Sequence, residues 1–202
     1  MARLYLVRHA VTAETGSRLS GRTAGIPLSE AGQSQAAALA ERFASGKLTE
    51  VLTSPVQRCR ETATAIGATT GVTPRVDWSF LEVDYGTWTG RTFAPLRRTK
   101  LWQQLFVSPS RVTFPAGESL RAAGSRAVGG IEAAVARSPR GRIAVVSHAD
   151  IIKMVVSHYV GQPFDLYQRL AVSPASVSVL DLPERGFPSV VAVNTPDPGP
   201  FL

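Results

Sequence analysis

The chain has little of several features that define other protein classes. Cys59 is the one cysteine in 202 residues, so an internal disulfide is excluded and a reducing compartment is permitted. We interpret it as a small buried hydrophobe rather than a reactive thiol. No uncharged apolar run reaches the ~18 residues that a membrane span needs, and no signal-like segment precedes the first apolar stretch. We therefore expect a cytoplasmic protein with no membrane partner.

Charged residues are also few, at 18% of the chain, whereas 44% of it is hydrophobic. At this length, that balance fits a well-buried core and argues against disorder. The sequence shows no linker and no internal repeat. We expect a single domain over residues 1–202, with a proline-rich tail from about residue 195.

The net charge of +7 comes from 22 Lys and Arg against 15 Asp and Glu, and most of the cations are arginine. An anionic small molecule and a nucleic acid both fit this balance. The tightest basic group, Arg97-Arg98 with Lys100, lacks the interleaved glycine and aromatic residues of a stacking platform, which disfavours nucleic acid. With Arg22 and Arg91, that group could favour a substrate with a second negative charge.

The periodicity of apolar residues predicts helices that alternate with strands. The expected strands are residues 4–7, 51–53, 73–78, 142–147, 176–182 and 190–193. The expected helices are residues 28–46 with Ser29 as N-cap, 54–71 with Ser54 as N-cap, 92–107, 118–138 and 151–160, and residues 162–172 are irregular or helical. This order predicts a three-layer α/β/α sandwich with a mostly parallel central sheet and an antiparallel edge.

Two of the expected strands end in histidine. Arg8 and His9 follow residues 4–7, and His148 follows residues 142–147. An open α/β sheet carries its chemistry at the carboxyl ends of its strands, so the histidines meet in one pocket if the strands are neighbours. A guanidinium matches phosphate oxygens, and a neutral imidazole can attack phosphorus. The alternative interpretation is that Arg8-His9 is only the polar end of a strand.

Two later residues fit the same chemistry. Arg58 lies one turn into a helix that follows a strand, within reach of an anion beside His9. Arg8, Arg58 and a protonated His148 would then meet the charge on the transferred group. Glu82, in an acidic and aromatic loop, could have its pKa raised enough to protonate the leaving oxygen, and Asp84 is its rival.

These residues belong to an ordered set of motifs: Arg8-His9-Ala10; Ser54, Arg58, Thr62 and Ala63; Leu81, Glu82, Gly86, Trp88 and Gly90; Gly117-Glu118-Ser119; and Ser147-His148. The set resembles the histidine phosphatase superfamily, the phosphoglycerate mutase-like proteins. The resemblance implies the phosphoglycerate mutase-like fold. It also implies His9 as the phosphorylated nucleophile, a phosphate pocket of Arg8, Arg58 and His148, and Glu82 as general acid and base.

The chain departs from the family pattern in three places. Ala10 replaces the usual glycine, Thr15 stands where an asparagine commonly contacts phosphate, and Ala149-Asp150 replace a glycine pair. The hydroxyl of Thr15 can still donate to an oxyanion. A carboxylate at Asp150 would repel an anion, so we interpret it as the N-cap of the following helix.

Several further residues have more than one interpretation. Gly21 and Arg22, in a tight turn, are expected to bind phosphate or substrate, and Arg18 could do the same, although a solvated loop face is equally compatible for the two arginines. We expect structural roles for His158 and Trp88. Histidines beside arginines favour phosphate over a cation, so we expect no metal and no cofactor.

The sequence thus predicts a phosphatase that hydrolyses small phosphomonoesters and releases inorganic phosphate. A mutase is the first alternative, but residues 90–117 offer little material for a lid that excludes water. A non-catalytic anion-binding or nucleic-acid-binding module is the second. The identity of the ester and the oligomeric state, a homo-oligomer included, are left open.

Overall fold

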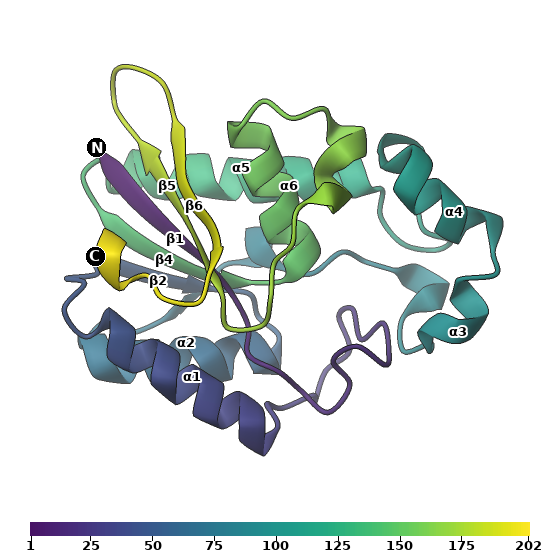
Figure 1. Cartoon of the computed structure of the whole chain (residues 1–202), viewed down its shortest axis with the longest axis horizontal. Helices are drawn as coiled ribbons and strands as arrows, with labels where there is room; N and C mark the ends of the chain where they lie inside the picture. Colours follow the sequence, from purple (N-terminus) through teal and green to yellow (C-terminus); the bar gives the residue numbers. More distant parts are fainter.

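The computed structural model describes residues 1–202 apart from the side chain of Pro200. Its centre is a six-stranded sheet in the order β3-β2-β4-β1-β5-β6 (Figure 1). The strands are β1 (Ala2–Arg8), β2 (Glu50–Thr53), β3 (Arg75–Val76), β4 (Arg142–Ser147), β5 (Val177–Leu182) and β6 (Ser189–Thr195). The first four strands pair in parallel, whereas β5 pairs antiparallel with β1 on one side and with β6 on the other. The predicted mostly parallel sheet with an antiparallel edge is confirmed.

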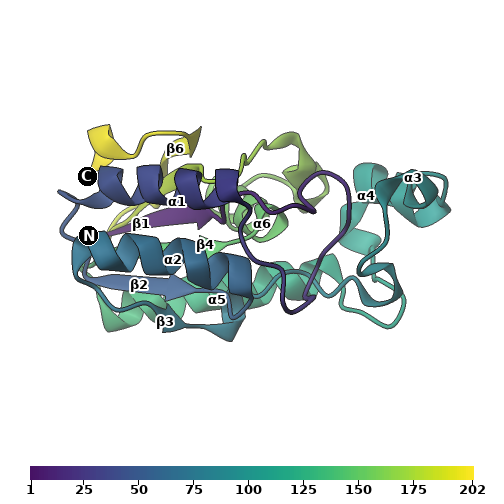
Figure 2. The same ribbon diagram turned by 90° about the horizontal axis from the view of Figure 1, so that it is seen from below.

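Helices cover both faces of this sheet (Figure 2). On one face lie α1 (Glu30–Phe43) and α2 (Gln57–Thr70), and on the other lie α5 (Leu120–Arg137) and α6 (Ala149–Tyr159). Within β1, Leu4 and Leu6 pack with the second helix pair, whereas Tyr5 and Val7 pack with the first. Because successive side chains of a strand point to opposite faces and both faces are covered, β1 is apolar from Leu4 to Val7. The expected three-layer sandwich is confirmed.

The structure corrects two expected helix N-caps. Helix α2 begins at Gln57 after Val56, which has no side-chain cap, so Ser54 is not its N-cap. The hydroxyl of Ser54 instead lies 2.9 Å from His148 Nε2. Helix α6 begins directly after His148, so Asp150 lies inside its first turn and is not its N-cap either. The carboxylate of Asp150 accepts a hydrogen bond from the Tyr85 hydroxyl at 3.1 Å.

The expected helix over residues 92–107 is two helices, α3 (Phe93–Leu96) and α4 (Lys100–Val107). The break arises because Thr99 starts a new helix, its hydroxyl accepting from the backbone N–H of Trp102. Both helices lie to one side of the sandwich, beyond the carboxyl ends of the parallel strands (Figures 1 and 2). Short 3-10 helices complete the chain: η1 (Trp78–Phe80), η2 (Gly86–Trp88), η3 (Pro109–Arg111), η4 (Phe164–Arg169) and η5 (Gly199–Phe201).

The C-terminal segment returns to the first strand. Strand β6 ends at Thr195, and the carbonyl of Phe201 accepts hydrogen bonds from Arg3 Nη1 at 2.8 Å and from the Tyr5 hydroxyl at 2.9 Å. Both chain ends therefore lie at the same side of the sheet (Figure 1). Within the described residues, no helix has the length and apolar character that crossing a membrane requires. A single domain over the whole chain stays a prediction.

Candidate active site

The two strand-terminal histidines meet because their strands are neighbours. Strands β1 and β4 pair in parallel with Arg8 opposite Ser147, so His9 and His148 leave the sheet side by side. Their ring centroids are 5.3 Å apart. The two rings therefore lie side by side, as the sequence predicts for adjacent strands, although His9 lines the cavity at this sheet edge and His148 is not among its lining residues.

His9 is held as a neutral ring with a defined tautomer. Its Nδ1 lies 2.8 Å from the carbonyl oxygen of Ala10, so Nδ1 carries the proton and donates. Its Nε2 accepts from Arg58 Nε at 3.2 Å, which requires a lone pair on Nε2. Burial, with the charge of Arg58 added, lowers the pKa of His9 to about 3. At neutral pH the ring is therefore unprotonated at Nε2, as a nucleophile must be.

His148 is completely buried and also neutral. Arg58 Nη2 lies 3.2 Å from its Nδ1, and its Nε2 lies 2.9 Å from the Ser54 hydroxyl. Burial and then the neighbouring Arg58 hold the pKa of His148 well below its usual value. The protonated His148 that the sequence predicts for charge stabilisation stays a prediction, and it needs an anion that offsets this burial and the charge of Arg58.

Arg8 and Arg58 each have an N–H donor for which no described residue supplies an acceptor. Arg58 Nη2 donates to the carbonyl of Gly21 at 2.7 Å, and Arg8 Nη1 donates to the carbonyl of Val172 at 2.7 Å. Arg8 Nε and Arg58 Nη1 are buried and have no hydrogen-bond partner among the described residues. Buried guanidinium donors are costly to leave unpaired, so these atoms mark a place that an anion fits.

Glu82 lies in the same cavity as His9 and Arg58. One of its carboxylate oxygens accepts from the backbone N–H of Val83 at 2.9 Å, and the other lies 3.6 Å from His148 Nδ1. Burial first, and the charge of Asp150 second, raise the pKa of Glu82 to about 7. A carboxyl that is partly protonated at neutral pH can both give and take a proton.

The rival acid, Asp84, lies outside the residues that line the cavity. Its side chain is 39% exposed and forms an ion pair with Arg22 at 3.3 Å. The geometry therefore favours Glu82 over Asp84 for contact with a ligand.

Arg22 also lies outside the cavity, which corrects the expectation that it clamps phosphate. Its guanidinium donates to the Glu82 carbonyl at 2.8 Å, to Asp84 at 3.3 Å and to Glu118 at 2.8 Å. The side chain ties the first loop to the acidic loop, and its donors are used for that purpose. A sequence pattern of glycine followed by arginine does not reveal such partners, which lie about 60 to 100 residues away.

Other loop residues do reach the cavity. Thr15, Arg18 and Gly21 line it. The Thr15 hydroxyl oxygen accepts from the backbone N–H of Thr12 at 2.9 Å, and Arg18 Nη1 donates to the carbonyl of Gly90 at 3.0 Å. Gly21 has φ +51°, and a side chain there would meet the ring of Tyr85. Contact of Thr15 and Gly21 with phosphate stays a prediction.

Two further side chains are packed as expected. Cys59 is completely buried, as expected of a small hydrophobe, and burial raises the pKa of its thiol to about 12, which disfavours the thiolate. Trp88 is buried against the rings of Trp102 and Phe114. His158 is exposed on α6 and is not among the residues that line the cavity. Within the part of the chain that the structure describes, no three His, Cys, Asp or Glu side chains gather as metal ligands do.

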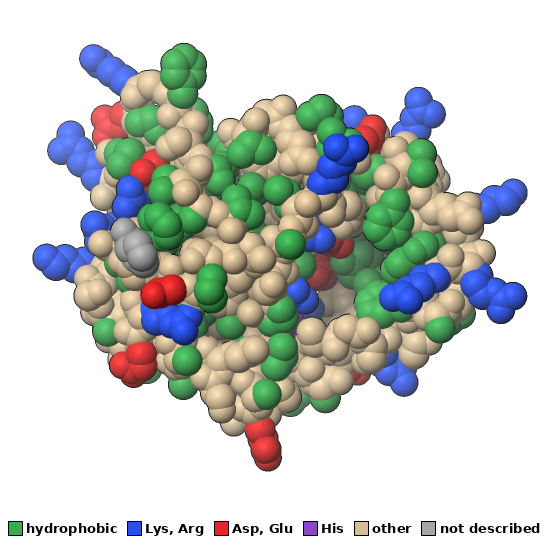
Figure 3. Space-filling view, in the orientation of Figure 1, with side chains coloured by type: hydrophobic (Ala, Val, Ile, Leu, Met, Phe, Trp, Pro, Cys, Tyr) green, Lys and Arg blue, Asp and Glu red, His purple; other side chains and the backbone are tan. Residues whose placement is uncertain are grey.

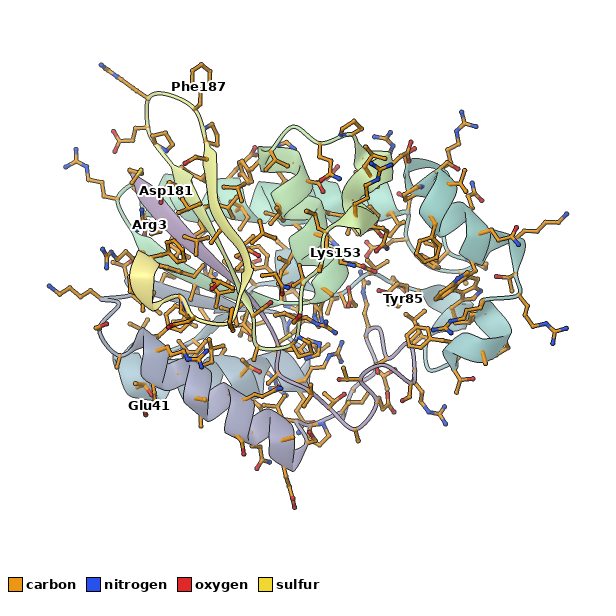
Figure 4. The ribbon with its side chains drawn as sticks, viewed as in Figure 1. Arg3, Glu41, Tyr85, Lys153, Asp181 and Phe187 are labelled. Atoms are coloured by element: carbon orange, nitrogen blue, oxygen red, sulfur yellow. The ribbon has the colours of Figure 1, made fainter. Side chains whose placement is uncertain are left out.

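The cavity has a volume of about 270 Å³ and extends from His9 towards α3 and α4. Figure 3 shows it as a hollow with hydrophobic side chains along its α3–α4 side, and Figure 4 shows Tyr85 pointing into this region. Sequence reasoning missed Ser54 as a partner of His148, and it missed Trp102 and Phe106 as lining residues. The four-residue spacing of Trp102 and Phe106 was the available signal, but the same spacing is typical of the apolar face of a packed helix.

Comparison with known proteins identifies the family to which this chain belongs. The model of the histidine phosphatase superfamily, branch 1, matches residues 4–195. A bifunctional protein of Mycobacterium tuberculosis is 32% identical over 95% of this chain, which spans 53% of that protein. The chain thus covers about half the length of this curated relative.

Other relatives match over most of their length. Phosphoserine phosphatase 1 of Hydrogenobacter thermophilus is 28% identical over 92% of this chain and 89% of its own. A solved mycobacterial glucosyl-3-phosphoglycerate phosphatase has 26% identity and a TM-score of 0.80, covering 88% of this chain and 89% of that one. The solved protein YhfR of Bacillus stearothermophilus has a TM-score of 0.89 at 22% identity, covering 96% and 97%, and is similar in fold.

Proposed function

Because the chain belongs to branch 1 of the histidine phosphatase superfamily, we propose that it is a phosphatase that hydrolyses small phosphomonoesters through a phosphohistidine on His9. The observation that carries the proposal is the neutral His9 ring beside two buried guanidinium donors, Arg8 Nε and Arg58 Nη1, that lack partners among the described residues. Relatives named as phosphatases of phosphoserine and of glucosyl-3-phosphoglycerate support the same reaction class.

In the first step, the lone pair on His9 Nε2 forms a bond to phosphorus as the bond from phosphorus to the ester oxygen breaks. The Nδ1–H bond to the Ala10 carbonyl stabilises the positive charge that develops on the ring. Arg8 and Arg58 bind the oxygens of the transferred group. Glu82 gives its proton to the departing oxygen, so the alcohol leaves neutral.

In the second step, water attacks the phosphohistidine and the bond from phosphorus to nitrogen breaks. Glu82, now a carboxylate, takes the proton of that water, which restores the acid and releases inorganic phosphate. His148 contributes once an anion is present, because a phosphate dianion nearby favours the protonated ring. The contact of Nε2 with the Ser54 hydroxyl holds the ring in place for this role, and protonation of Nδ1 would end its acceptance from Arg58.

A His9→Ala variant tests the proposal. We expect it to lose hydrolysis of p-nitrophenyl phosphate and to lose trapping of labelled phosphate on the protein in a form stable to base and labile to acid. The matched control is His158→Ala, because His158 is exposed and lies outside the cavity. Wild-type rates in the His9→Ala variant would overturn the proposal.

A mutase is the second candidate, because a protein of Cronobacter sakazakii named as a probable phosphoglycerate mutase is 29% identical over 90% of this chain. Incubation with 3-phosphoglycerate and a bisphosphate primer separates the two reactions. A phosphatase releases inorganic phosphate, whereas a mutase yields the 2-phospho isomer. We favour hydrolysis, since the stretch between Gly90 and Gly117 is short for a lid that would exclude water.

The binding-module alternative makes a different forecast. A protein of that kind would bind duplex DNA with an affinity that falls steeply as the salt concentration rises, and it would have no phosphatase activity. A cytoplasmic setting and the absence of a cofactor stay predictions as well.

A further inference from the structure

The outer part of the cavity is built from aromatic side chains. Trp102 and Phe106 of α4 line it together with Phe93 of α3. Tyr85, Trp88 and Phe114 add to the same wall. The phosphate end of the cavity is therefore continuous with an apolar chamber that a leaving group would occupy.

These rings form one packed unit. Trp102 lies 6.5 Å from Trp88 in a stacked arrangement, 5.9 Å from Phe93 and 5.7 Å from Phe106, measured between ring centroids. Phe106 is nevertheless 58% exposed. A large apolar ring that lines a cavity and still contacts water gains from burial when a ligand covers it.

The charges around the chamber also favour an apolar leaving group. Among the described residues that line the cavity, Arg8 and Arg58 lie beside His9, whereas the outer cation is Arg18, an exposed side chain that is bonded to the Gly90 carbonyl. Asp150 puts a carboxylate in the wall. One of its oxygens accepts from Tyr85 at 3.1 Å and the other lies 3.8 Å from Lys153 Nζ.

The basic residues that the sequence suggested for binding a second negative charge do not line the cavity. Arg22 is engaged by Asp84 and Glu118. The side chains of Arg91, Arg97, Arg98 and Lys100 are exposed, and none of them lines the cavity. A second anionic group on the substrate would meet aromatic rings and the Asp150 carboxylate at the cavity wall. The cations nearby are Arg18 and Arg97, whose guanidinium lies 6.0 Å from the centre of the Trp102 ring, and both side chains are exposed, so solvent weakens their attraction and the desolvation of the anion is not fully repaid.

We propose that the preferred substrates are phosphomonoesters of aromatic or bulky apolar alcohols, and that the chamber rejects esters whose alcohol carries a carboxylate or a second phosphate. This substrate class rests on the proposed phosphatase function. Trp102 and Phe106 act as specificity-determining residues, because they contact the leaving group rather than the transferred phosphoryl group. Asp150 acts against anionic leaving groups.

A series of three alkyl esters tests the proposal: benzyl phosphate, 4-carboxybenzyl phosphate and methyl phosphate. Their alcohols have similar acidity, so differences in kcat/KM report contacts rather than leaving-group reactivity. We expect benzyl phosphate to exceed methyl phosphate by about tenfold to hundredfold, the effect of burying one phenyl ring. The 4-carboxybenzyl ester should fall at least about tenfold below the benzyl ester.

Two variants assign the effect to residues. Phe106→Ala should lower kcat/KM for benzyl phosphate by about threefold to tenfold more than for methyl phosphate, because only the larger ester reaches that ring. The matched control is Phe187→Ala, since Phe187 is 93% exposed at the tip of the β5–β6 loop, far from the cavity (Figure 4). Asp150→Asn should narrow the gap between the benzyl and 4-carboxybenzyl esters.

The outcomes separate the two proposals. If the protein hydrolysed none of the three esters and no p-nitrophenyl phosphate, the phosphatase function itself would be overturned. Hydrolysis of all three esters with equal kcat/KM, or a preference for the 4-carboxybenzyl ester, would overturn the substrate class and leave the phosphatase function standing. Equal losses on benzyl and methyl phosphate in Phe106→Ala would remove Phe106 from the specificity-determining residues.

Discussion

Glu82 and His9 share one buried pocket, yet their pKa values move in opposite directions. Burial raises the pKa of the Glu82 carboxyl to about 7 and, with Arg58, lowers the pKa of His9 to about 3. Both shifts have the same cause, since burial penalises whichever form carries charge. Near pH 7 the imidazole is therefore free to attack while much of the carboxyl keeps the proton that a leaving group needs.

The first residue-scale prediction concerns the acid. Glu82→Gln should lower kcat/KM by ~10²–10⁴-fold on an alkyl phosphate and much less on p-nitrophenyl phosphate, whose anion departs without a proton. In the wild type, kcat/KM on the alkyl ester should fall as pH rises through about 7, because the acid form of Glu82 in the free enzyme is then lost. The measurement is a pair of pH–rate profiles, one for each ester.

Arg58→Ala provides the contrast, because Arg58 contacts the group that both esters share and its loss should affect both. An equal loss on the two esters in Glu82→Gln would move the acid's role to another residue, and Asp84 would be the next to test.

The second residue-scale prediction concerns stability in acid. The folded pKa of His9 lies below that of an unfolded histidine, so this residue stabilises the fold above about pH 6.5, and the contribution is lost as pH falls towards about 3. The slope is about 1.4 kcal/mol per pH unit in this window. His9→Gln should therefore lose less unfolding free energy than the wild type between pH 6.5 and 5.

Urea unfolding at the two pH values measures this difference, because carboxylates that titrate in both proteins cancel in the comparison. His158→Gln is the control and should keep the wild-type slope, since His158 is exposed. A His9→Gln slope equal to that of the wild type would mean that His9 titrates normally in the fold.

At the scale of elements, two glycines in or next to helices should respond to alanine with opposite signs. Gly71 ends α2 in the left-handed region at φ +74°, whereas Gly129 lies inside α5 and is exposed. A Cβ at either position would meet nothing within 4 Å, so only backbone preference decides the outcome. Gly71→Ala should destabilise the fold by about 1 kcal/mol, whereas Gly129→Ala should stabilise it by roughly 0.5–1 kcal/mol.

Chemical unfolding of the two variants beside the wild type tests both signs in one experiment. A gain in stability for Gly71→Ala would contradict the left-handed end of α2, and a loss for Gly129→Ala would point to packing at a position that the structure leaves open.

At the scale of the whole molecule, Glu118 joins three distant segments. Its Oε1 accepts from Arg22 Nη2 and Arg126 Nη2, each at 2.8 Å, and from the backbone N–H of Asp84 at 2.9 Å. Both arginines also donate to the carbonyl of Glu82. One carboxylate thus holds the first loop, the acidic loop and α5 around the backbone of the candidate acid.

Glu118→Gln should lower the free energy of unfolding by about 1–3 kcal/mol, because charged hydrogen-bond partners are left without their carboxylate. Burial alone would raise the pKa of Glu118, but hydrogen bonds from Arg126 and the Asp84 amide lower it overall. The stabilisation is therefore present above the pKa of an unfolded glutamate, and the effect of the variant should shrink in acid.

The matched control is Glu184→Gln, since Glu184 forms an exposed ion pair with Arg140 at 3.6 Å and such pairs contribute little. Unfolding curves at pH 7 and pH 4 measure both variants. Equal effects of the two substitutions at pH 7 would remove Glu118 from its linking role.

The sequence by itself determined the layers and the chemistry that meets at the sheet edge. The apolar runs of β1 and β4 could only be strands covered on both faces, and their terminal histidines had to lie at one edge once those strands paired. These features follow from local residue order, because strand periodicity and the position of a polar residue after a strand are both short-range properties. The ordered motifs supplied the family by resemblance.

Tertiary structure alone decided which polar side chains have donors left over. The sequence suggested phosphate contacts for both Arg22 and Arg58, yet Arg22 is used by distant carboxylates whereas Arg58 keeps a buried donor without a partner among the described residues. The N-cap roles predicted for Ser54 and Asp150 are wrong for the same reason, since both side chains bond to groups far along the chain. Hydrogen-bond partners and desolvation depend on groups brought together from far along the chain, and residue order does not specify those distances.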